Sequence, residues 1–319
     1  MPSVAKASEG NGVAVAVVDS GVDASHPDLA GAILPGVDVG GTGDGRTDVN
    51  GHGTGIAGLV AARGRADEAG ALGIAPKSMI LPVEAGGPGN PLIPEAVDWA
   101  VARGARVICI ALATGSSQAL ESAIRRGIQA DAVIVAGAGN DPAAGIQAPA
   151  KYEGVVAVVG VDRTGQRASF SAIGPSATLA APAVDIVSTD RGGKYVKSSG
   201  TSDATAIIAG VAALVRSKFP QLSAREVIHR MTATAIDKGK PGRDDEYGYG
   251  IVNPVGALTA DVPPLTESSS PGSAAPPNIG AQPQPGNKGS SAALGWLIGA
   301  VLLAAAGTGA AIAIRRAGR

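Results

Sequence analysis

The sequence predicts an α/β protein: a doubly wound, mostly parallel sheet with helices on both faces, followed by one C-terminal transmembrane helix. Short apolar runs recur along the chain, helix-like stretches lie between them, and an uncharged segment occupies residues 292–314. Continuous apolar runs, rather than alternating ones, indicate strands that are buried on both faces. Alternation of such strands with helices is typical of a parallel sheet.

Five apolar runs are the expected strands, and they span residues 13–18, 78–83, 106–112, 132–136 and 155–161. The first is rich in β-branched residues and is ended by Asp19 and Gly21. In doubly wound sheets, reactive groups gather beyond the C-terminal ends of the strands and at helix N-termini. Those positions are therefore the places to look for chemistry.

Three helices are expected, over residues 94–104, 118–129 and 223–235. The first has a proline near its start and a glycine at its end, an asymmetry that many helices share. Ser116 or Ser117 is placed to cap the second helix. The third opens with Ser223 and Glu226 at the spacing of a capping box.

Composition narrows the classes of function. The chain has 319 residues, a formal net charge of −1, one cysteine and three histidines. The balanced charge does not suggest a nucleic-acid partner. One cysteine excludes an intrachain disulfide, a cysteine-cluster zinc site and an iron–sulfur centre, and three histidines leave little room for a histidine-built metal site.

Changes in composition divide the chain into five segments. They are a lead-in (1–10), a globular domain (11–259), a Pro/Ser/Gly-rich linker (260–291), the uncharged transmembrane segment (292–314) and a basic tail (315–319). As a helix, the uncharged segment would be about 34 Å long, which is enough to span a bilayer. Three arginines follow it while only Lys288 stands close before it. The positive-inside rule then places the tail in the cytoplasm and the domain outside a cell membrane.

An exported domain needs a signal peptide, and the polar residues that open this chain do not resemble one. We expect that signal, and the start of the exported protein, upstream of Met1. The alternative is insertion of the C-terminal helix alone, with the domain left in the cytoplasm.

Four residues stand where chemistry is expected. Asp19 ends the first apolar run, and His52 lies among glycines in NGHGTGIAG. Asn140 follows a predicted strand in VIVAGAGND, and Ser202 enters a long apolar helix in SSGTSDATA. Each residue alone also fits an ordinary structural role, such as a turn residue or a helix N-cap. For Asn140 a nucleotide-binding loop is a third interpretation, which Pro142 weakens because a glycine belongs at that position.

Together the four residues fit acyl transfer. Ser202 would attack a carbonyl carbon, His52 would take and return the proton, and Asp19 would hold the imidazole in its tautomer. The side-chain amide of Asn140 and the backbone N–H of Ser202 would bind the tetrahedral oxyanion.

Five segments resemble those of the subtilisin-type (S8) serine peptidases: VAVVDSGVD with HPDL, NGHGTGIAG, VIVAGAGN, GTSDATAIIAGVAALV and YGYGIVNPVGALT. The resemblance spans residues 11–259 and includes the family's Asp, His, Ser order. It implies a subtilisin-like fold and endopeptidase activity on polypeptides. The linker and membrane segment resemble those of the mycosins, the membrane-anchored subtilases of type VII secretion, which implies secretion components as partners.

The family resemblance also implies a substrate-binding strand. The usual Ser-Leu-Gly of that strand corresponds to Ala111, Leu112 and Ala113, and Gly137 is expected to contact substrate beside it. No cofactor is expected. Calcium is the one ion to weigh, but the acidic clusters at 44–48 and 244–246 match no known calcium loop, so solvated loop charge is the preferred interpretation.

Several residues depart from the family pattern. Gly55 replaces a histidine, Asp203 a methionine and Ala206 a proline, and Cys109 has no partner although mycosins are expected to contain disulfides. On a helix Asp203 would point about 100° away from the preceding residue. Asp203 and Ala206, together with Ala111 and Ala113 of the substrate strand, motivate a second hypothesis. It is a catalytically impaired pseudo-peptidase that serves as a structural component of a secretion complex. A nucleotide-binding oxidoreductase remains a third class on the α/β pattern alone.

Overall fold

The computed structural model describes residues 2–65, 70–87 and 89–265. The chain divides into two compact units, Met1–Ser268 and Ser269–Arg319. The predicted transmembrane helix and basic tail lie outside the described residues, as do residues 266–291 of the predicted linker. Among the described residues, no helix is both long and apolar enough to cross a membrane.

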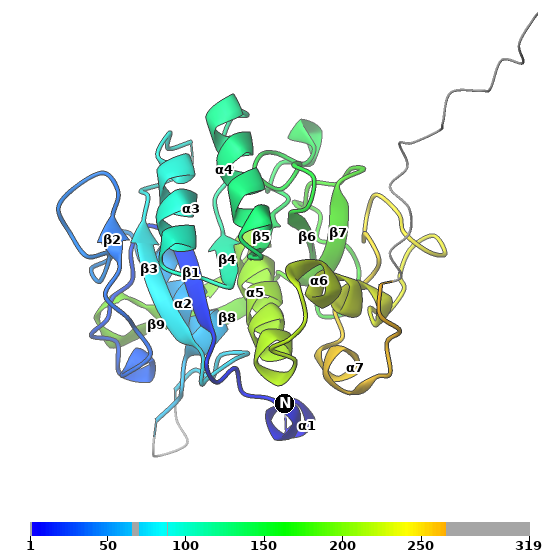
Figure 1. The fold of residues 1–319 in the computed structure, drawn as a ribbon, viewed down its shortest axis with the longest axis horizontal. Coiled ribbons are helices and arrows are strands. Elements are labelled where there is room, and N and C mark those ends of the chain that lie inside the picture. The colour runs from blue at the N-terminus through cyan, green and yellow to red at the C-terminus, as the bar shows by residue number, and fades with distance from the viewer. Residues whose placement is uncertain (1, 66–69, 88, 266–319) are drawn as a thin grey trace, which may run out of the picture. The chain divides into compact units, whose positions relative to one another are not determined.

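A seven-stranded sheet forms the centre of the first unit, and its strand order is β2-β3-β1-β4-β5-β6-β7 (Figure 1). Its strands are β1 (Ala14–Asp19), β2 (Val37–Asp38), β3 (Met79–Glu84), β4 (Val107–Ile110), β5 (Val133–Gly137), β6 (Val156–Val161) and β7 (Ala177–Pro182). Every neighbouring pair is parallel. The five expected strands are confirmed. The expected strand 106–112 was too long, because the ladder ends at Ile110 and leaves Ala111 and Leu112 in the segment that follows it.

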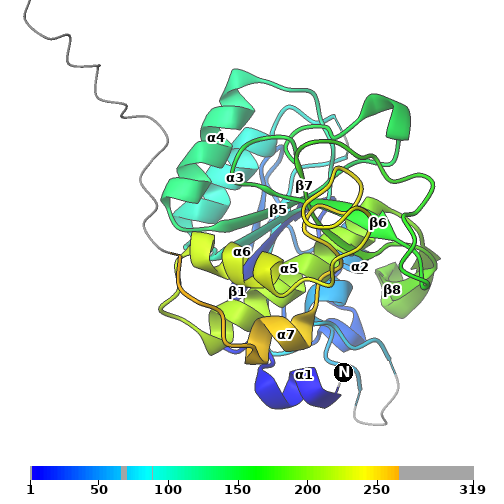
Figure 2. The same cartoon turned by 90° about the vertical axis from the view of Figure 1, so that its right-hand side faces the viewer.

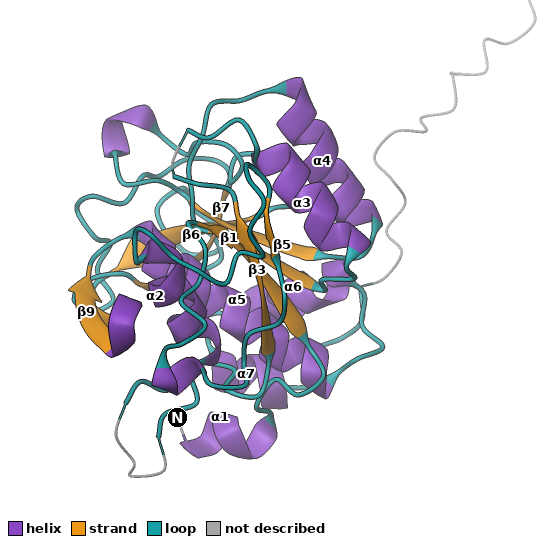
Figure 3. Cartoon of the chain, turned by 90° about the vertical axis from the view of Figure 1, so that its left-hand side faces the viewer, coloured by secondary structure: helices purple, strands orange, loops and turns teal. Residues whose placement is uncertain are grey.

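Helices cover both faces of the sheet. They are α1 (Pro2–Ala7), α2 (His52–Ala61), α3 (Ile93–Ala102), α4 (Gln118–Gln129), α5 (Thr201–Lys218), α6 (Ala224–Ala233) and α7 (Pro254–Thr259). Figures 2 and 3 show α3 and α4 on one face and α2, α5 and α6 on the other. The three expected helices are confirmed. Ser117 caps α4 by accepting a hydrogen bond from Leu120 N, and Ser223 and Glu226 form the expected capping box.

The two helical layers explain why the strands are apolar throughout. In β1, Val15 and Val17 pack in the core beneath α2 and α5, while Ala16 and Val18 pack in the core beneath α3 and α4. Each of these side chains is at most 1% exposed. Because successive side chains of a strand point to opposite faces, a strand covered on both sides has no polar face.

Four strands were not predicted. Two are the edge strands β2 and β7, and the others form an antiparallel hairpin, β8 (Ile186–Asp190) and β9 (Lys194–Ser198). The hairpin strand β9 is exposed along most of its length and has no continuous apolar run. It lies directly before α5 and carries the chain to the helix that begins at Thr201.

The strand order reverses at β1, which lies between β3 and β4. The chain first adds strands on one side of β1 and then crosses to add β4 to β7 on the other. In open α/β sheets, ligands bind outside the carboxyl ends of the strands at such a switch point. Asp19 is the last residue of β1 and therefore stands at this point.

Candidate active site

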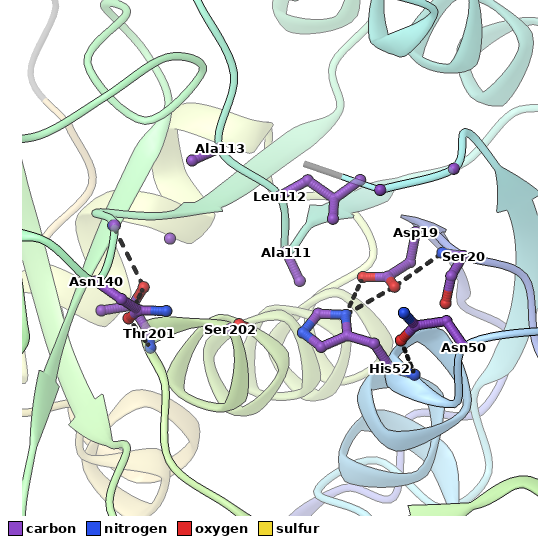
Figure 4. Close-up of a pocket in the computed structure, with 14 residues that line it drawn as sticks. Asp19, Ser20, Asn50, His52, Ala111, Leu112, Ala113, Asn140, Thr201 and Ser202 are labelled. Atoms are coloured by element: carbon purple, nitrogen blue, oxygen red, sulfur yellow. Dashed lines mark hydrogen bonds and ion pairs between the residues drawn. The ribbon is translucent and has the colours of Figure 1, made fainter. Parts of the chain in front are cut away.

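A cavity of about 410 Å³ opens at the carboxyl ends of the central strands. All eight predicted site residues line it: Asp19, His52, Ala111, Leu112, Ala113, Gly137, Asn140 and Ser202. They come from segments that are distant in the sequence, and Figure 4 shows the seven of them that it labels around one space. Sequence reasoning missed six further lining residues, namely Ser20, Asn50, Gly86, Gly87, Gly139 and Thr201. Four of the six directly adjoin or lie within the quoted motifs and could have been found there.

The imidazole of His52 is bonded to the carboxylate of Asp19. His52 Nδ1 donates to Asp19 Oδ1 at 2.7 Å and lies 2.9 Å from Oδ2. Asp19 is buried, and its Oδ1 also accepts from the backbone N–H of Ser20. A proton held on Nδ1 leaves the lone pair on Nε2, and Figure 4 shows that second nitrogen directed toward Ser202.

Two glycines bring His52 this close to β1. A Cβ at Gly53 would lie 2.0 Å from the carbonyl oxygen of Gly21, so only a glycine lets the first turn of α2 approach the end of β1. Gly51 is the N-cap of α2 at φ 100°, a conformation that side chains disfavour. The glycines beside His52 therefore allow the start of α2 to lie close to the end of β1.

Burial lowers the pKa of His52, but the hydrogen bond to Asp19 and the negative charges of Asp19, Asp203 and Asp48 outweigh it and raise that pKa above its ordinary value. The charged imidazolium is thus stabilised by three carboxylates on three different segments. A histidine in this setting can accept a proton as a general base and later donate it as a general acid.

Ser202 is the second residue of α5, and Gly200 is the N-cap of that helix. The alternative role of Ser202 as an N-cap is therefore wrong. Its backbone N–H belongs to the first turn of the helix, where N–H groups have no intrahelical acceptor and the helix dipole favours negative charge. The hydroxyl and a donor-rich helix end thus face the same cavity.

The side chain of Asn140 is oriented by Thr201. Asn140 Oδ1 accepts from the backbone N–H and the hydroxyl of Thr201, at 2.9 and 3.0 Å. The amide nitrogen is therefore turned away from these donors. A Cβ built on Gly200 would lie 3.4 Å from both Asn140 Nδ2 and Ser202 Oγ, so the amide nitrogen and the hydroxyl flank one small space.

Asp203 does not point into this space, as its position on the helix predicted. It is 6% exposed, and Ser198 Oγ donates to its carboxylate at 2.9 and 3.0 Å. Burial raises the pKa of Asp203, while the bond from Ser198 and the charge of His52 oppose that rise. Asp203, the residue after Ser202 that differs from the family pattern, is therefore a buried carboxylate hydrogen-bonded to the last residue of β9.

The preferred interpretation of the acidic cluster 44–48 is wrong at Asp48. Its carboxylate accepts hydrogen bonds from Ser20 after β1, from Asn50 and Gly51 in the loop before α2, and from Thr54 in the first turn of α2. In the described part of the chain, no group of three or more His, Cys, Asp or Glu side chains is placed to hold a metal ion.

Comparison with known proteins identifies the family. The model of the subtilase family, Peptidase_S8, matches residues 10–250. The chain belongs to the subtilase family. It is 40% identical over 249 residues to a thermostable alkaline protease of Halalkalibacterium halodurans, covering 76% of this chain and 67% of that protein. It is 37% identical to subtilisin DY of Bacillus licheniformis over 77% of this chain and 90% of that protein.

Solved structures extend this finding to the mycosins. MycP1 without its N-terminal propeptide superposes with a TM-score of 0.74 and 30% identity, covering 82% of this chain and 95% of that one. MycP3, a protease of the type VII (ESX-3) secretion system, gives a TM-score of 0.72 and 34% identity over 82% of this chain and 86% of that one. The resemblance to subtilases of the mycosin type is thereby confirmed.

Proposed function

We propose that this protein is a serine endopeptidase that cleaves polypeptides through Asp19, His52 and Ser202. The observation that carries the proposal is the 2.7 Å bond between His52 Nδ1 and Asp19, in one cavity with Ser202 and Asn140. The bond selects the tautomer whose Nε2 is a base. Membership of the subtilase family, with a protease relative that is 40% identical, supports the same reaction.

In the proposed reaction, Ser202 Oγ attacks the scissile carbonyl carbon as His52 Nε2 removes its proton. Asp19 stabilises the imidazolium, and the negative oxygen of the tetrahedral intermediate accepts from Asn140 Nδ2 and Ser202 N–H. His52 then protonates the departing amine, which leaves an acyl-enzyme. Water activated by His52 releases the acid and restores Ser202.

Substrate is proposed to bind as an extended strand beside Ala111, Leu112 and Ala113. These residues follow β4 directly and line the cavity together with Gly137. A short backbone segment at the end of a parallel strand offers N–H and C=O groups to a polypeptide of almost any sequence, because main-chain bonding is independent of side chains.

The test is a fluorophosphonate probe, which reacts with an activated serine. We expect labelling of the protein, none in Ser202→Ala, and a strong decrease in His52→Ala. Ser199→Ala serves as the matched control, because that serine lies three residues earlier and does not line the cavity. Well-folded protein that shows no Ser202-dependent labelling would contradict the proposal.

A pseudo-peptidase is the second candidate, and Asp203 is the observation that favours it. A buried negative charge beside the nucleophile opposes the developing oxyanion. The probe separates the two functions, because a pseudo-peptidase remains unlabelled while its fold and partners are intact. Replacement of Asp203 by methionine, the usual family residue, would then restore labelling.

We further propose that residues 292–314 anchor the enzyme in the cell membrane, with the peptidase domain outside and the C-terminus in the cytoplasm. The absence of charge in this segment and the arginines after it support this topology. The mycosin neighbours support work beside a type VII secretion apparatus. Protease added to intact cells should digest the domain, and a shielded domain would contradict the topology.

A further inference from the structure

The carboxylate of Asp48 collects five hydrogen bonds. Its Oδ1 accepts from Ser20 Oγ at 3.0 Å, from Asn50 N at 2.9 Å and from Gly51 N at 2.8 Å. Its Oδ2 accepts from Thr54 N at 2.9 Å and from Thr54 Oγ1 at 2.6 Å. Both oxygens are therefore fully used, and all five donors belong to the segments on either side of Asp19 and His52.

These bonds join the two segments that carry the predicted acid–base pair. Ser20 directly follows Asp19, whereas Asn50, Gly51 and Thr54 flank His52 in the sequence. Ser20 Oγ also accepts from the backbone N–H of Gly53 at 3.1 Å, which adds a second link from the first turn of α2 to the end of β1. Hydrogen bonds thus join the end of β1 to the loop before α2 and to the first turn of α2.

Apolar packing does not hold the outer side of this loop. Val49 is 78% exposed, and the side chain of His52 is 39% exposed. The loop's further anchor is Arg191, whose guanidinium donates to the carbonyl oxygen of Val49. Since the loop has little core to define it, the orientation of His52 depends on its hydrogen bonds.

We propose that Asp48 is a positioning residue for His52. This inference rests on the proposed function: Asp48 acts through Ser20, Thr54 and the loop backbone to keep His52 on Asp19. It is absent from the cavity lining and contacts no reacting atom in the described structure. Reactions that depend on aligned groups are sensitive to small displacements, and a misplacement of about 1 Å can cost about 100-fold in rate.

Charge and position must be separated, because Asp48 also faces His52 as an anion. The carboxylates that act on His52 are Asp19 from β1, Asp203 from α5 and Asp48 from the loop before α2. Asp48→Asn removes the charge and replaces one acceptor oxygen. Ser20→Ala and Thr54→Val instead keep the charge, and each removes one side-chain hydrogen bond to the Asp48 carboxylate. Thr54→Ser keeps both the charge and the hydroxyl.

The experiment measures kcat, KM and their pH dependence on a peptide substrate for these four variants of the full chain. We expect kcat to fall about 10- to 100-fold in Asp48→Asn, with KM changed less than about twofold. Thr54→Val and Ser20→Ala should lose part of that rate, and Thr54→Ser should recover it. Asp44→Asn is the matched control, because it removes an exposed charge of the same cluster without touching α2.

A second readout does not need turnover. The chain has three histidines, so the titration of His52 can be followed by NMR and assigned with His52→Gln. A looser bond to Asp19 should lower the pKa of His52 in Thr54→Val and Ser20→Ala, although both keep the Asp48 charge. An unlabelled parent protein would refute the proposed function, while unchanged His52 titration in both charge-retaining variants would overturn the positioning role. A kcat loss in Asp44→Asn equal to that in Asp48→Asn would overturn it as well.

Discussion

The histidine side and the serine side of the cleft are held by different chemical groups. On the histidine side, the carboxylates of Asp19 and Asp48 accept most of the hydrogen bonds that orient His52 and the loop before it. On the serine side, neutral groups do this work: Asn140 Oδ1 accepts from Thr201, and the Thr205 hydroxyl bonds back to the Thr201 carbonyl. The one carboxylate there, Asp203, is directed onto Ser198.

This difference matches the charge that each side would stabilise in the proposed reaction. Carboxylates favour the positive imidazolium that forms on His52, whereas a negative oxyanion beside Ser202 requires donors and no free anion. Thr201 donates to the carbonyl end of the Asn140 amide, and the N–H end is therefore left for the oxyanion of the proposed reaction. Substitutions on one side of the cleft should therefore affect the charge that forms on that side.

The largest effect is expected on the histidine side, from Asp19→Asn. An amide in place of the carboxylate can donate to Nδ1 and so place the proton on Nε2, where the base is needed. We expect kcat to fall about 10⁴-fold, as known for the equivalent change in a serine protease triad. Steady-state kinetics on a peptide substrate measures it. A loss below tenfold would mean that Asp19 does not select the tautomer.

On the serine side, Asn140→Ala should lower kcat about 10²- to 10³-fold with little change in KM, a magnitude known from a subtilisin. Thr201→Val is the companion variant, because it removes one bond to Asn140 Oδ1 and keeps the backbone bond. It should lose less than Asn140→Ala. If Asn140→Ala instead raised KM by as large a factor as it lowered kcat, Asn140 would have a role in binding substrate.

A pair of glycines tests the close approach of α2 to β1. Gly53→Ala would place a methyl carbon 2.0 Å from Gly21 O and should displace His52, with a loss of about 100-fold in kcat. Gly55→Ala is the matched control, since its Cβ would meet nothing nearer than Thr189 O at 3.4 Å. Similar kinetics for the two variants would show that the contact at Gly53 does not position His52.

The smallest effect is expected on the pH profile, because Asp203 on the serine side acts on His52 on the other side. The charge of Asp203 raises the pKa of His52, so Asp203→Asn should lower that pKa and move the acid limb of the kcat/KM profile to lower pH. The variant therefore retains more of its plateau activity near pH 6, a region about where histidines titrate. Ser198→Ala keeps the Asp203 charge and should leave the limb in place. A limb that moves upward in Asp203→Asn would reverse the assigned sign.

Local patterns in the sequence accounted for much of the fold. The five apolar runs became β1, β3, β4, β5 and β6, because a strand buried on both faces leaves a continuous hydrophobic signature. The edge strands and the hairpin were missed for the opposite reason. In β9 the residues are mostly exposed, so nothing in their hydrophobicity distinguishes them from a loop.

The sequence by itself determined which chemical groups the cleft contains: Asp19, His52, Asn140 and Ser202 were found from their motifs. Only the tertiary structure decided how these groups are held. Asp48 read as solvated loop charge until folding placed it against Ser20, which is 28 positions away in the sequence. For Ser202 the sequence left an N-cap role open as an alternative, which the structure excludes because Gly200 is the N-cap of α5. Hydrogen bonds between segments distant in the chain leave no local periodicity, so no pattern along the sequence records them.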